Sequence, residues 1–297
     1  MTDRVAGAFH HLSALAAFVV LVSNVVSAAG AESSSKFEPG PCPFSQSDAA
    51  PYHVDCGSVA VPEYRARTDS PLVRLKVAIV RSAMAHPLHD PVVFLEGGPG
   101  GPSLDVLTLR VRGSPLVQRI LQSRDLIYWD QRGTGESEPH LCRTLDVEWF
   151  RNAELGFSLE EERRRNLAVF KSCAAELARA HTDVTQFGTE TSAADLEDIR
   201  IALAVNSWNL YGGSYGTRLG LAAMRQTPGH IRAALLDGVY PPNAPQPIAQ
   251  AWRLARVIDL LGKRCGEDLR CNARYPNIAA RTYGVIERAA RDPLLSP

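Results

Sequence analysis

One stretch decides the fold of this chain: Gly212-Gly213-Ser214-Tyr215-Gly216. It has the pattern G-x-S-x-G, in which small residues stand two positions before and two positions after a serine. This spacing permits a sharp turn from a strand into a helix, with the serine hydroxyl exposed at the tip of the turn. The pattern therefore predicts that Ser214 is a nucleophile.

The residues on either side of this turn fit the required context. Before it, residues 208–211 form a short apolar and aromatic run that is typical of a buried parallel strand. After it, apolar side chains follow the spacing of a helix that packs on a sheet: Leu219, Ala222, Ala223 and Met224. The alternative, a glycine-rich turn with only a structural role, explains this strand–turn–helix order less well.

The overall composition excludes one large class of partners. The chain has 297 residues, which is enough for one large α/β domain or two small ones. Lysine and arginine together equal aspartate and glutamate, so the net charge is zero. Because no basic face is implied, we expect no nucleic-acid partner.

The N-terminus has the features of a secretory signal. Arg4 is followed by an apolar stretch over residues 12–26 and then by small residues, where cleavage between Ala28 and Ala31 is expected. The alternative is a membrane anchor, but the stretch is short for a span of about 20 residues and ends in small residues, not basic ones. We therefore predict a signal peptide over residues 1–31, a secreted or other extracytoplasmic location, and no stable membrane anchor.

The cysteines support export. Six are present, and they fall in three pairs that are close in sequence: Cys42 with Cys56, Cys142 with Cys173, and Cys265 with Cys271. Six cysteines allow many connectivities, so this pairing rests on proximity alone, and free buried thiols are the alternative. No C-x-x-C motif or nearby cysteine and histidine cluster occurs, so we expect no metal site and no cofactor.

Strand and helix patterns alternate along the chain. The expected strands cover residues 59–61, 72–80, 92–95, 126–129, 208–211 and 233–236. The last four of these are apolar runs and are expected to be buried. The alternation predicts an α/β fold with a mostly parallel sheet flanked by helices, over a core domain of residues 32–240. Residues 140–190 form an expected helical insertion, in which Ser158 and Glu161 cap a helix that extends to about residue 180.

Three further helices complete this pattern. Ser192 is expected to cap the helix that precedes the Ser214 strand. Several prolines follow Asp237, and beyond them helices are expected at about 248–263 and 277–291. We interpret residues 241–297 as the start of a helical cap or lid over Ser214.

A serine nucleophile also needs donors for the oxyanion. One candidate is the backbone N–H of Tyr215, which begins a helix. The other is expected from the glycine loop, defined as residues 97–101, with Gly98 as the first choice and Gly97 as the second. Pro99 has no N–H and cannot serve. A phosphate cradle is the alternative for this loop, but no lysine follows it in a Walker pattern.

Three motifs, in this order, make a specific resemblance. They are Gly-Gly-Pro-Gly-Gly at 97–101, Asp-Gln-Arg-Gly-Thr-Gly-Glu-Ser at 130–137 and Gly-Gly-Ser-Tyr-Gly-Thr at 212–217. Over roughly residues 40–295 the chain resembles the secreted α/β-hydrolases related to proline iminopeptidase and tripeptidyl aminopeptidase. The resemblance implies the α/β-hydrolase fold and hydrolysis of the serine aminopeptidase type, with Ser214 as nucleophile and a peptide or small ester or amide as substrate. It also supports the three local disulfides.

The resemblance further implies roles for residues near the site and shows two departures. Asp130 and Arg132 resemble residues that order loops. Glu96 stands where proline iminopeptidases usually have histidine, which we interpret as a subgroup trait. The family places its acid and histidine on the last strands, and we expect these strands to be missing here. Asp237 is the only stand-in acid, and His230 belongs to a surface turn.

The leading hypothesis from the sequence is thus a secreted serine hydrolase, an aminopeptidase that releases residues or short peptides from peptide N-termini. The chain is expected to be a fragment or truncated form, nearly inactive because it lacks the acid and histidine. One alternative is a non-catalytic, secreted protein of the same fold that binds a ligand in the remaining cleft. Another is an esterase or lipase that uses the same nucleophile.

Overall fold

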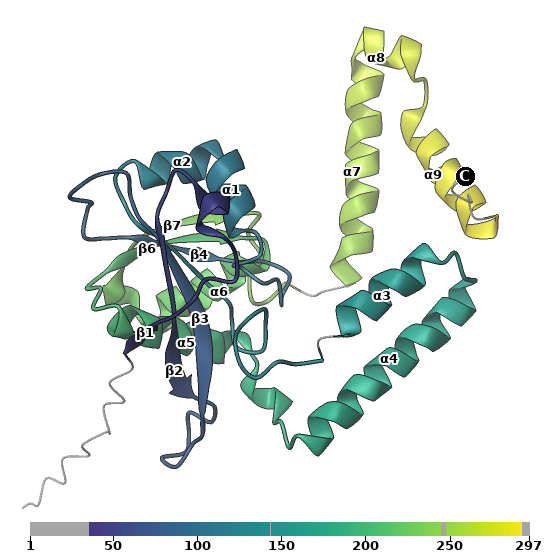
Figure 1. Cartoon of the computed structure of the whole chain (residues 1–297). Coiled ribbons are helices and arrows are strands. Elements are labelled where there is room, and N and C mark those ends of the chain that lie inside the picture. Colours follow the sequence, from purple (N-terminus) through teal and green to yellow (C-terminus); the bar gives the residue numbers. More distant parts are fainter. Residues whose placement is uncertain (1–35, 143, 245–247, 293–297) are drawn as a thin grey trace, which may run out of the picture. The chain divides into compact units, whose positions relative to one another are not determined.

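The computed structural model describes residues 36–142, 144–244 and 248–292 (Figure 1). The predicted signal peptide over residues 1–31, with its cleavage region, lies outside the described residues. Within them, no helix is both long and apolar enough to cross a membrane.

One mixed sheet of seven strands forms the centre of the described fold, in the order β1-β2-β3-β5-β4-β6-β7 (Figure 1). The strands are β1 Phe37–Pro39, β2 Val54–Pro62, β3 Leu72–Val80, β4 Val92–Leu95, β5 Leu126–Trp129, β6 Trp208–Gly213 and β7 Ile231–Asp237. The neighbours β5, β4, β6 and β7 are parallel, whereas β1, β2, β3 and β5 pair antiparallel.

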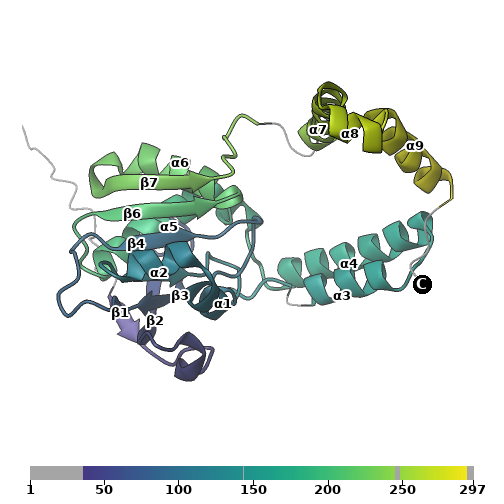
Figure 2. The same ribbon diagram turned by 90° about the horizontal axis from the view of Figure 1, so that it is seen from above.

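Helices cover both faces of this sheet. The helices of the core are α1 Leu107–Gly113, α2 Pro115–Leu121, α5 Thr189–Ala202 and α6 Tyr215–Gln226. Alternate residues of β4 face opposite sides, as the strand period requires. Val93 and Leu95 pack in a cluster with residues of α5 and α6, whereas Val92 and Phe94 pack with residues of α1 and α2. Figure 2 shows the strands between these two pairs of helices.

The expected helical insertion is a pair of helices, α3 Leu145–Glu154 and α4 Leu159–Arg179 (Figure 2). The Ser158 hydroxyl accepts the Glu161 N–H at 3.3 Å, as expected of a cap. The Glu161 carboxylate, however, binds Arg164 and Arg165, so the predicted reciprocal capping box is only half formed. A disulfide between Cys142 and Cys173 joins the start of the insertion to α4.

The cap of α5 was placed wrongly by the sequence pattern. The helix begins at Thr189, three residues before the residue expected to cap it, and its N-cap is Gly188 in an extended conformation. Ser192 lies inside the first turns of the helix, because its N–H donates to the Gly188 carbonyl at 3.0 Å. Its side chain is buried. That bond spans four residues, as in a helix interior.

The burial of β7 was also predicted wrongly. Ala233 and Ala234 are exposed, and Leu235 keeps 47% of its surface accessible. Among the described strands β7 pairs only with β6, so it forms an edge of the sheet. Parallel strands are buried on both faces only where other elements cover them.

The C-terminal segment contains one more helix than expected. It consists of α7 Ile248–Glu267, α8 Leu269–Arg274 and α9 Ile278–Arg291. The Asp268 carboxylate starts α8 by accepting the backbone N–H groups of Arg270 and Cys271 at 2.9 and 2.8 Å. A disulfide between Cys265 and Cys271 links α7 to α8. The segment is thus stabilised by local caps and by one covalent link.

The structure joins all six cysteines in the three pairs that proximity favoured. The third pair, Cys42–Cys56, links the N-terminal segment to β2, with 5.1 Å between the two Cα atoms. All three Cα separations are within the range that a disulfide requires.

Candidate active site

Ser214 occupies a strained turn between β6 and α6. Its φ of 51° and ψ of −121° lie outside the regions that residues with side chains ordinarily adopt. The turn is held in place because the Ser214 N–H donates to the Asp237 carbonyl at 2.9 Å, and its carbonyl accepts the Thr217 N–H at 3.0 Å. Strain of this kind persists where the surroundings fix it, and it is concentrated at functional sites. The side chain is exposed, as a nucleophile requires.

Packing explains why the flanking positions are glycines. A Cβ atom on Gly216 would lie 1.9 Å from the Leu95 carbonyl oxygen, and one on Gly212 would lie 2.6 Å from the Gly216 oxygen. Real Cβ atoms do not approach so closely, so any larger residue would displace the backbone. The small residues of the G-x-S-x-G pattern are therefore required by close backbone contacts around the turn.

The glycine loop lies directly beside Ser214. A Cβ atom on Gly97 would be 3.2 Å from the Ser214 Cβ. The Gly97 N–H donates to the Glu96 Oε1 at 2.8 Å and is therefore engaged. Tyr215 is the first residue of α6, so its N–H has no partner within that helix. The structure thus brings Ser214, Tyr215 and the loop together, and Gly98 as second oxyanion donor stays a prediction.

A cleft of about 400 Å³ opens at Ser214. The residues that line this Ser214 cleft are Phe94, Glu96, Arg110, Tyr211, Gly213, Ser214, Asp237 and Gly238. No histidine belongs to this lining within the described part of the chain, and no described side chain hydrogen-bonds to the Ser214 hydroxyl. The described cleft therefore supplies a nucleophile and charged groups, but no imidazole base.

His230 lies at the other end of the sheet. Strands β6 and β7 run parallel, with Trp208 opposite Ile231 and Gly213 opposite Asp237. His230 precedes Ile231, so at about 3.3 Å per residue it is roughly 20 Å from Ser214. Its Nδ1 is 2.8 Å from a carboxylate oxygen of Glu197. This placement agrees with the surface position expected from the sequence.

The stand-in acid, Asp237, is closer to the nucleophile. Its carbonyl accepts the Ser214 N–H, and it lines the Ser214 cleft. With no imidazole in the described lining, Asp237 has no base to orient there. Asp237 therefore adds a negative charge to the Ser214 cleft, but it does not form a catalytic triad with the described lining residues.

The sequence did not identify Arg110 as a site residue. This side chain comes from α1, and its guanidinium carbon lies 4.4 Å from the centre of the Phe94 ring. Its Nη2 is 3.5 Å from the Glu96 Oε2. An arginine in an ordinary amphipathic helix carries no local sequence signal, so only the packing of α1 against the end of β4 could reveal it.

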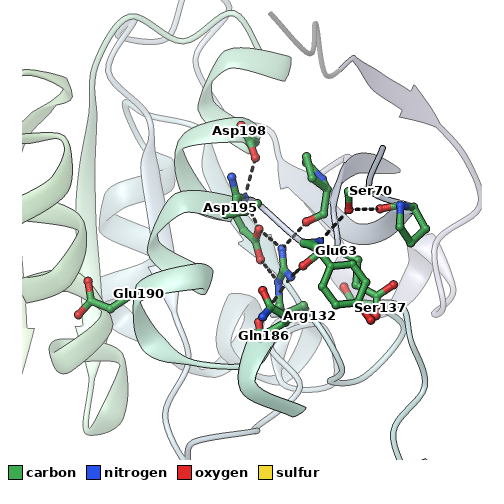
Figure 3. A network of polar contacts seen from close by, with 12 residues as sticks. Glu63, Ser70, Arg132, Ser137, Gln186, Glu190, Asp195 and Asp198 are labelled. Carbon is green, nitrogen blue, oxygen red and sulfur yellow. Dashed lines mark hydrogen bonds and ion pairs between the residues drawn. The ribbon is translucent and has the colours of Figure 1, made fainter. Parts of the chain in front are cut away.

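A buried ion network fixes the loop of residues 130–137. Arg132 is 3% exposed and donates to Asp195 of α5 from Nε and Nη2 at 2.7 and 2.6 Å. Its Nη1 donates to the Glu63 carbonyl at 2.9 Å. Arg65 donates to the carboxylates of both Asp195 and Asp198, which extends the network across α5 (Figure 3). Arg132 thus orders the loop, as the resemblance implied.

Asp130 holds the same loop against the chain that follows the glycine loop. One carboxylate oxygen accepts the Leu104 N–H and the other accepts the Glu136 N–H, both at 3.0 Å. Burial raises the pKa of Asp130, although backbone hydrogen bonds from Glu136, Leu104 and Ser103 oppose the rise. Asp130 therefore joins the 130–137 loop to the chain that follows the glycine loop.

No group of three or more histidine, cysteine, aspartate or glutamate side chains that could hold a metal ion is found in the described ranges. Near Ser214, one Glu96 oxygen accepts the Gly97 N–H, and the other lies 3.5 Å from the Arg110 Nη2. The chemistry available at the site is that of a hydroxyl, carboxylates and one guanidinium.

The chain matches a known protein family, and it is similar in sequence to several known proteins. A family model described as the alpha/beta hydrolase fold matches residues 90–260, which is more than half of the chain. This match contains the glycine loop, the 130–137 loop and the Ser214 turn.

Three relatives illustrate the similarity. Serine protease Hip1 from Mycobacterium tuberculosis is 28% identical over 252 residues, which are 82% of this chain and 46% of that protein. Tripeptidyl aminopeptidase from Streptomyces lividans is 28% identical over 65% of this chain and 36% of its own length. Proline iminopeptidase from Xylella fastidiosa is 27% identical over 52% of this chain and 34% of its own length. The chain thus spans about half the length, or less, of the curated relatives it matches.

Proposed function

We propose, since this chain belongs to the α/β-hydrolase fold family, that it acts as a serine hydrolase of the peptidase type with Ser214 as its nucleophile. One observation carries the proposal: Ser214 is exposed and held at a φ of 51° directly beside the glycine loop. The names of the relatives, which are a serine protease and two aminopeptidases, support the peptidase type.

The proposed chemistry follows from the groups at the turn. The Ser214 Oγ attacks a substrate carbonyl and forms an ester with the acyl group, while the amine leaves with a proton. The Tyr215 N–H and the Gly98 N–H donate to the oxyanion that forms in the transition state. A serine hydroxyl is a weak nucleophile unless a base takes its proton, and we assign that base to no residue of the described cleft.

The finer part of the proposal is a secreted aminopeptidase that removes residues or short peptides from N-termini. The signal-like sequence over residues 1–31 and the three disulfides support export, since disulfides persist in oxidising compartments. As the start of a lid, residues 241–297 would restrict entry to short substrates. Internal cleavage of long folded proteins at the rate of short peptides would contradict this part.

Residues 1–297 by themselves are proposed to turn over slowly, because the described lining of the Ser214 cleft contains no imidazole. Loss of the base removes most of the rate of a serine hydrolase and leaves effects of about 10³–10⁴ over water from binding and the oxyanion donors. The expected behaviour is therefore weak but specific reactivity at Ser214.

Labelling with a fluorophosphonate tests the assignment of the nucleophile. We expect slow labelling of the 297-residue chain, mapped by peptide analysis to Ser214 and abolished by Ser214→Ala. Ser207→Ala is the matched control, because Ser207 directly precedes β6, the strand that leads to Ser214. Labelling that persists in Ser214→Ala would overturn the proposal.

A non-catalytic binding protein of the same fold is the second candidate. It is favoured by the lining of the Ser214 cleft, which holds no histidine within the described residues. Ligand binding without any labelling of Ser214 would support this candidate. An esterase is distinguished by its substrates: faster release from an ester than from the peptide with the same acyl group, beyond the intrinsic difference in reactivity, would favour it.

A further inference from the structure

The Ser214 cleft contains buried polar atoms that lack hydrogen-bond partners. Within the described residues these are the Glu96 Oε2 and the Arg110 Nε, and the hydroxyl of Tyr128, which is not part of the lining, lacks a partner as well. The Phe94 ring lies 5.3 Å from the Tyr128 ring and 4.4 Å from the Arg110 guanidinium carbon, so these polar groups surround one side chain of the lining. Buried polar atoms in proteins are almost always paired, so such a concentration points to a polar ligand.

The position of the Glu96 carboxylate is fixed by the loop that follows it. Its Oε1 accepts the Gly97 N–H at 2.8 Å. A Cβ atom on Gly101 would lie 3.1 Å from the Glu96 Cγ, so the loop packs closely against the side chain. The side chain is 16% exposed, and Oε2 is the oxygen left for another partner.

Arg110 satisfies this oxygen only in part. Its Nη2 lies 3.5 Å from Oε2, which is longer than a normal hydrogen bond. The guanidinium also lies over the Phe94 ring, which provides a second attraction. The Glu96 carboxylate therefore keeps the capacity to accept a strong, charged donor.

The balance of charge in the cleft favours a cation. The lining contains two carboxylates, on Glu96 and Asp237, and one guanidinium, on Arg110. A single positive charge on a ligand would neutralise the remaining negative charge. An ammonium group offers that charge together with three N–H donors in a compact shape.

We propose that Glu96 binds the α-ammonium group of the peptide substrate and thereby selects a free N-terminus beside Ser214. This inference rests on the proposed function and names the residue that would determine its specificity. The ammonium donates a charge-assisted hydrogen bond to the Glu96 Oε2, which is stronger than a neutral one. An acylated N-terminus has lost both the charge and the donors, so it is expected to bind weakly.

The test compares two small ligands that differ only in this group. Binding of leucine amide and of N-acetyl-leucine amide to the 297-residue chain is measured by calorimetry or by NMR titration. We expect the free amine to bind about tenfold more tightly or better, since a hydrogen bond to a charged group is worth at least that factor. Glu96→Gln keeps an acceptor for Gly97 but removes the charge, so the preference should disappear.

Two further variants separate recognition from structure. Glu136→Gln makes the same chemical change on an exposed side chain of the 130–137 loop, outside the cleft, and should keep the preference. Arg110→Gln removes the competing cation beside Glu96 and should tighten the binding of the free amine. A merely structural role of the pair would instead weaken both ligands alike.

The outcomes also distinguish this inference from the proposed function. Equal binding of the two ligands, binding of neither, or a preference that survives Glu96→Gln overturns the inference. Fluorophosphonate labelling of Ser214 reports on the nucleophile separately. If Ser214 is labelled but the free amine is not preferred, only the inference about Glu96 is wrong. If the free amine is preferred but Ser214 is not labelled, the proposed hydrolase function is wrong and the cleft is a binding site for free N-termini.

Discussion

Two shielded carboxylates, Asp195 and Glu96, have opposite surroundings. The Asp195 side chain is completely buried, and both its oxygens accept hydrogen bonds from guanidinium groups of Arg65 and Arg132. The Glu96 side chain is shielded almost as well, but only one of its oxygens has a hydrogen-bond partner among the described residues. The same chemical group is thus saturated at one place and half-satisfied at the other.

The comparison distinguishes a buried carboxylate that stabilises the fold from one that can bind a ligand. A buried carboxylate whose two oxygens both accept hydrogen bonds from guanidinium groups is already paired without a ligand, and it holds the 130–137 loop to α5. A buried carboxylate with an unused oxygen costs free energy in the folded state. That cost is offset when a ligand supplies the missing donor. The predictions below therefore treat Asp195 as a stability residue and Glu96 as a binding residue.

The largest expected effect is on the saturated carboxylate. Asp195→Ala leaves Arg132 as an unpaired buried charge, so the free energy of unfolding should fall by about 3–5 kcal/mol. Urea unfolding followed by circular dichroism measures this loss. Glu96→Gln should change the unfolding free energy by less than about 1 kcal/mol. Equal losses of stability in the two variants would show that Glu96 is a stability residue like Asp195.

A smaller loss is expected at the glycine that supports the turn. Gly216→Ala places a Cβ atom 1.9 Å from the Leu95 carbonyl oxygen, so the backbone must move. Overpacking of this kind costs about 1–3 kcal/mol, and the displaced turn should also slow labelling of Ser214. Gly213→Ala is the matched change, since nothing lies within 4 Å of its Cβ position. Its unfolding free energy should stay close to that of the wild type.

A third carboxylate, Asp90, is expected to make the stability of the fold depend on pH in the acid range. Burial by itself raises the pKa of Asp90, but hydrogen bonds from Asn209 and Arg124 and the charges of Arg124 and Arg232 outweigh it and lower the pKa below the ordinary 3.8. A lowered pKa contributes stability that is present above 3.8 and lost as pH falls through the folded-state value. The stability difference between wild type and Asp90→Asn should therefore shrink in acid.

Urea unfolding of both proteins, from neutral pH to below 3.8, measures that difference. A difference that stays constant over this range would contradict the assignment. Asp130 provides a contrast of sign, because burial raises its pKa and its protonation on acidification favours the folded state.

The smallest effect is expected on the exposed helix α4. Hydrogen bonds from Arg164 and Arg165 lower the pKa of Glu161 to about 2. The group is exposed to water, which screens its charge, so the pair contributes little to stability. Glu161→Gln should leave the urea midpoint within error of the wild type. A clear loss would show that α4 depends on this pair more than its exposure suggests.

Local patterns predicted most elements of the fold, and the predicted α/β-hydrolase fold class is confirmed. The errors have a common cause. Ser192 has a good capping side chain, but Gly188 takes the extended N-cap conformation and the helix starts earlier. The apolar run in β7 has the pattern of a buried strand, yet β7 is an edge of the described sheet. In each case the observed backbone arrangement, not the local residue type, decided the result.

The sequence by itself determined the Ser214 turn and the glycine loop, because their steric requirements can be met only by glycines at fixed spacing. Gly212 and Gly216 have to be small since backbone atoms lie where their side chains would be. The tertiary structure alone decided which charges share the cleft. Glu96 follows β4 and Arg110 belongs to α1, and no local pattern joins them. Only the packing of α1 against the sheet brings the guanidinium within 3.5 Å of the carboxylate and leaves the buried Oε2 half-satisfied.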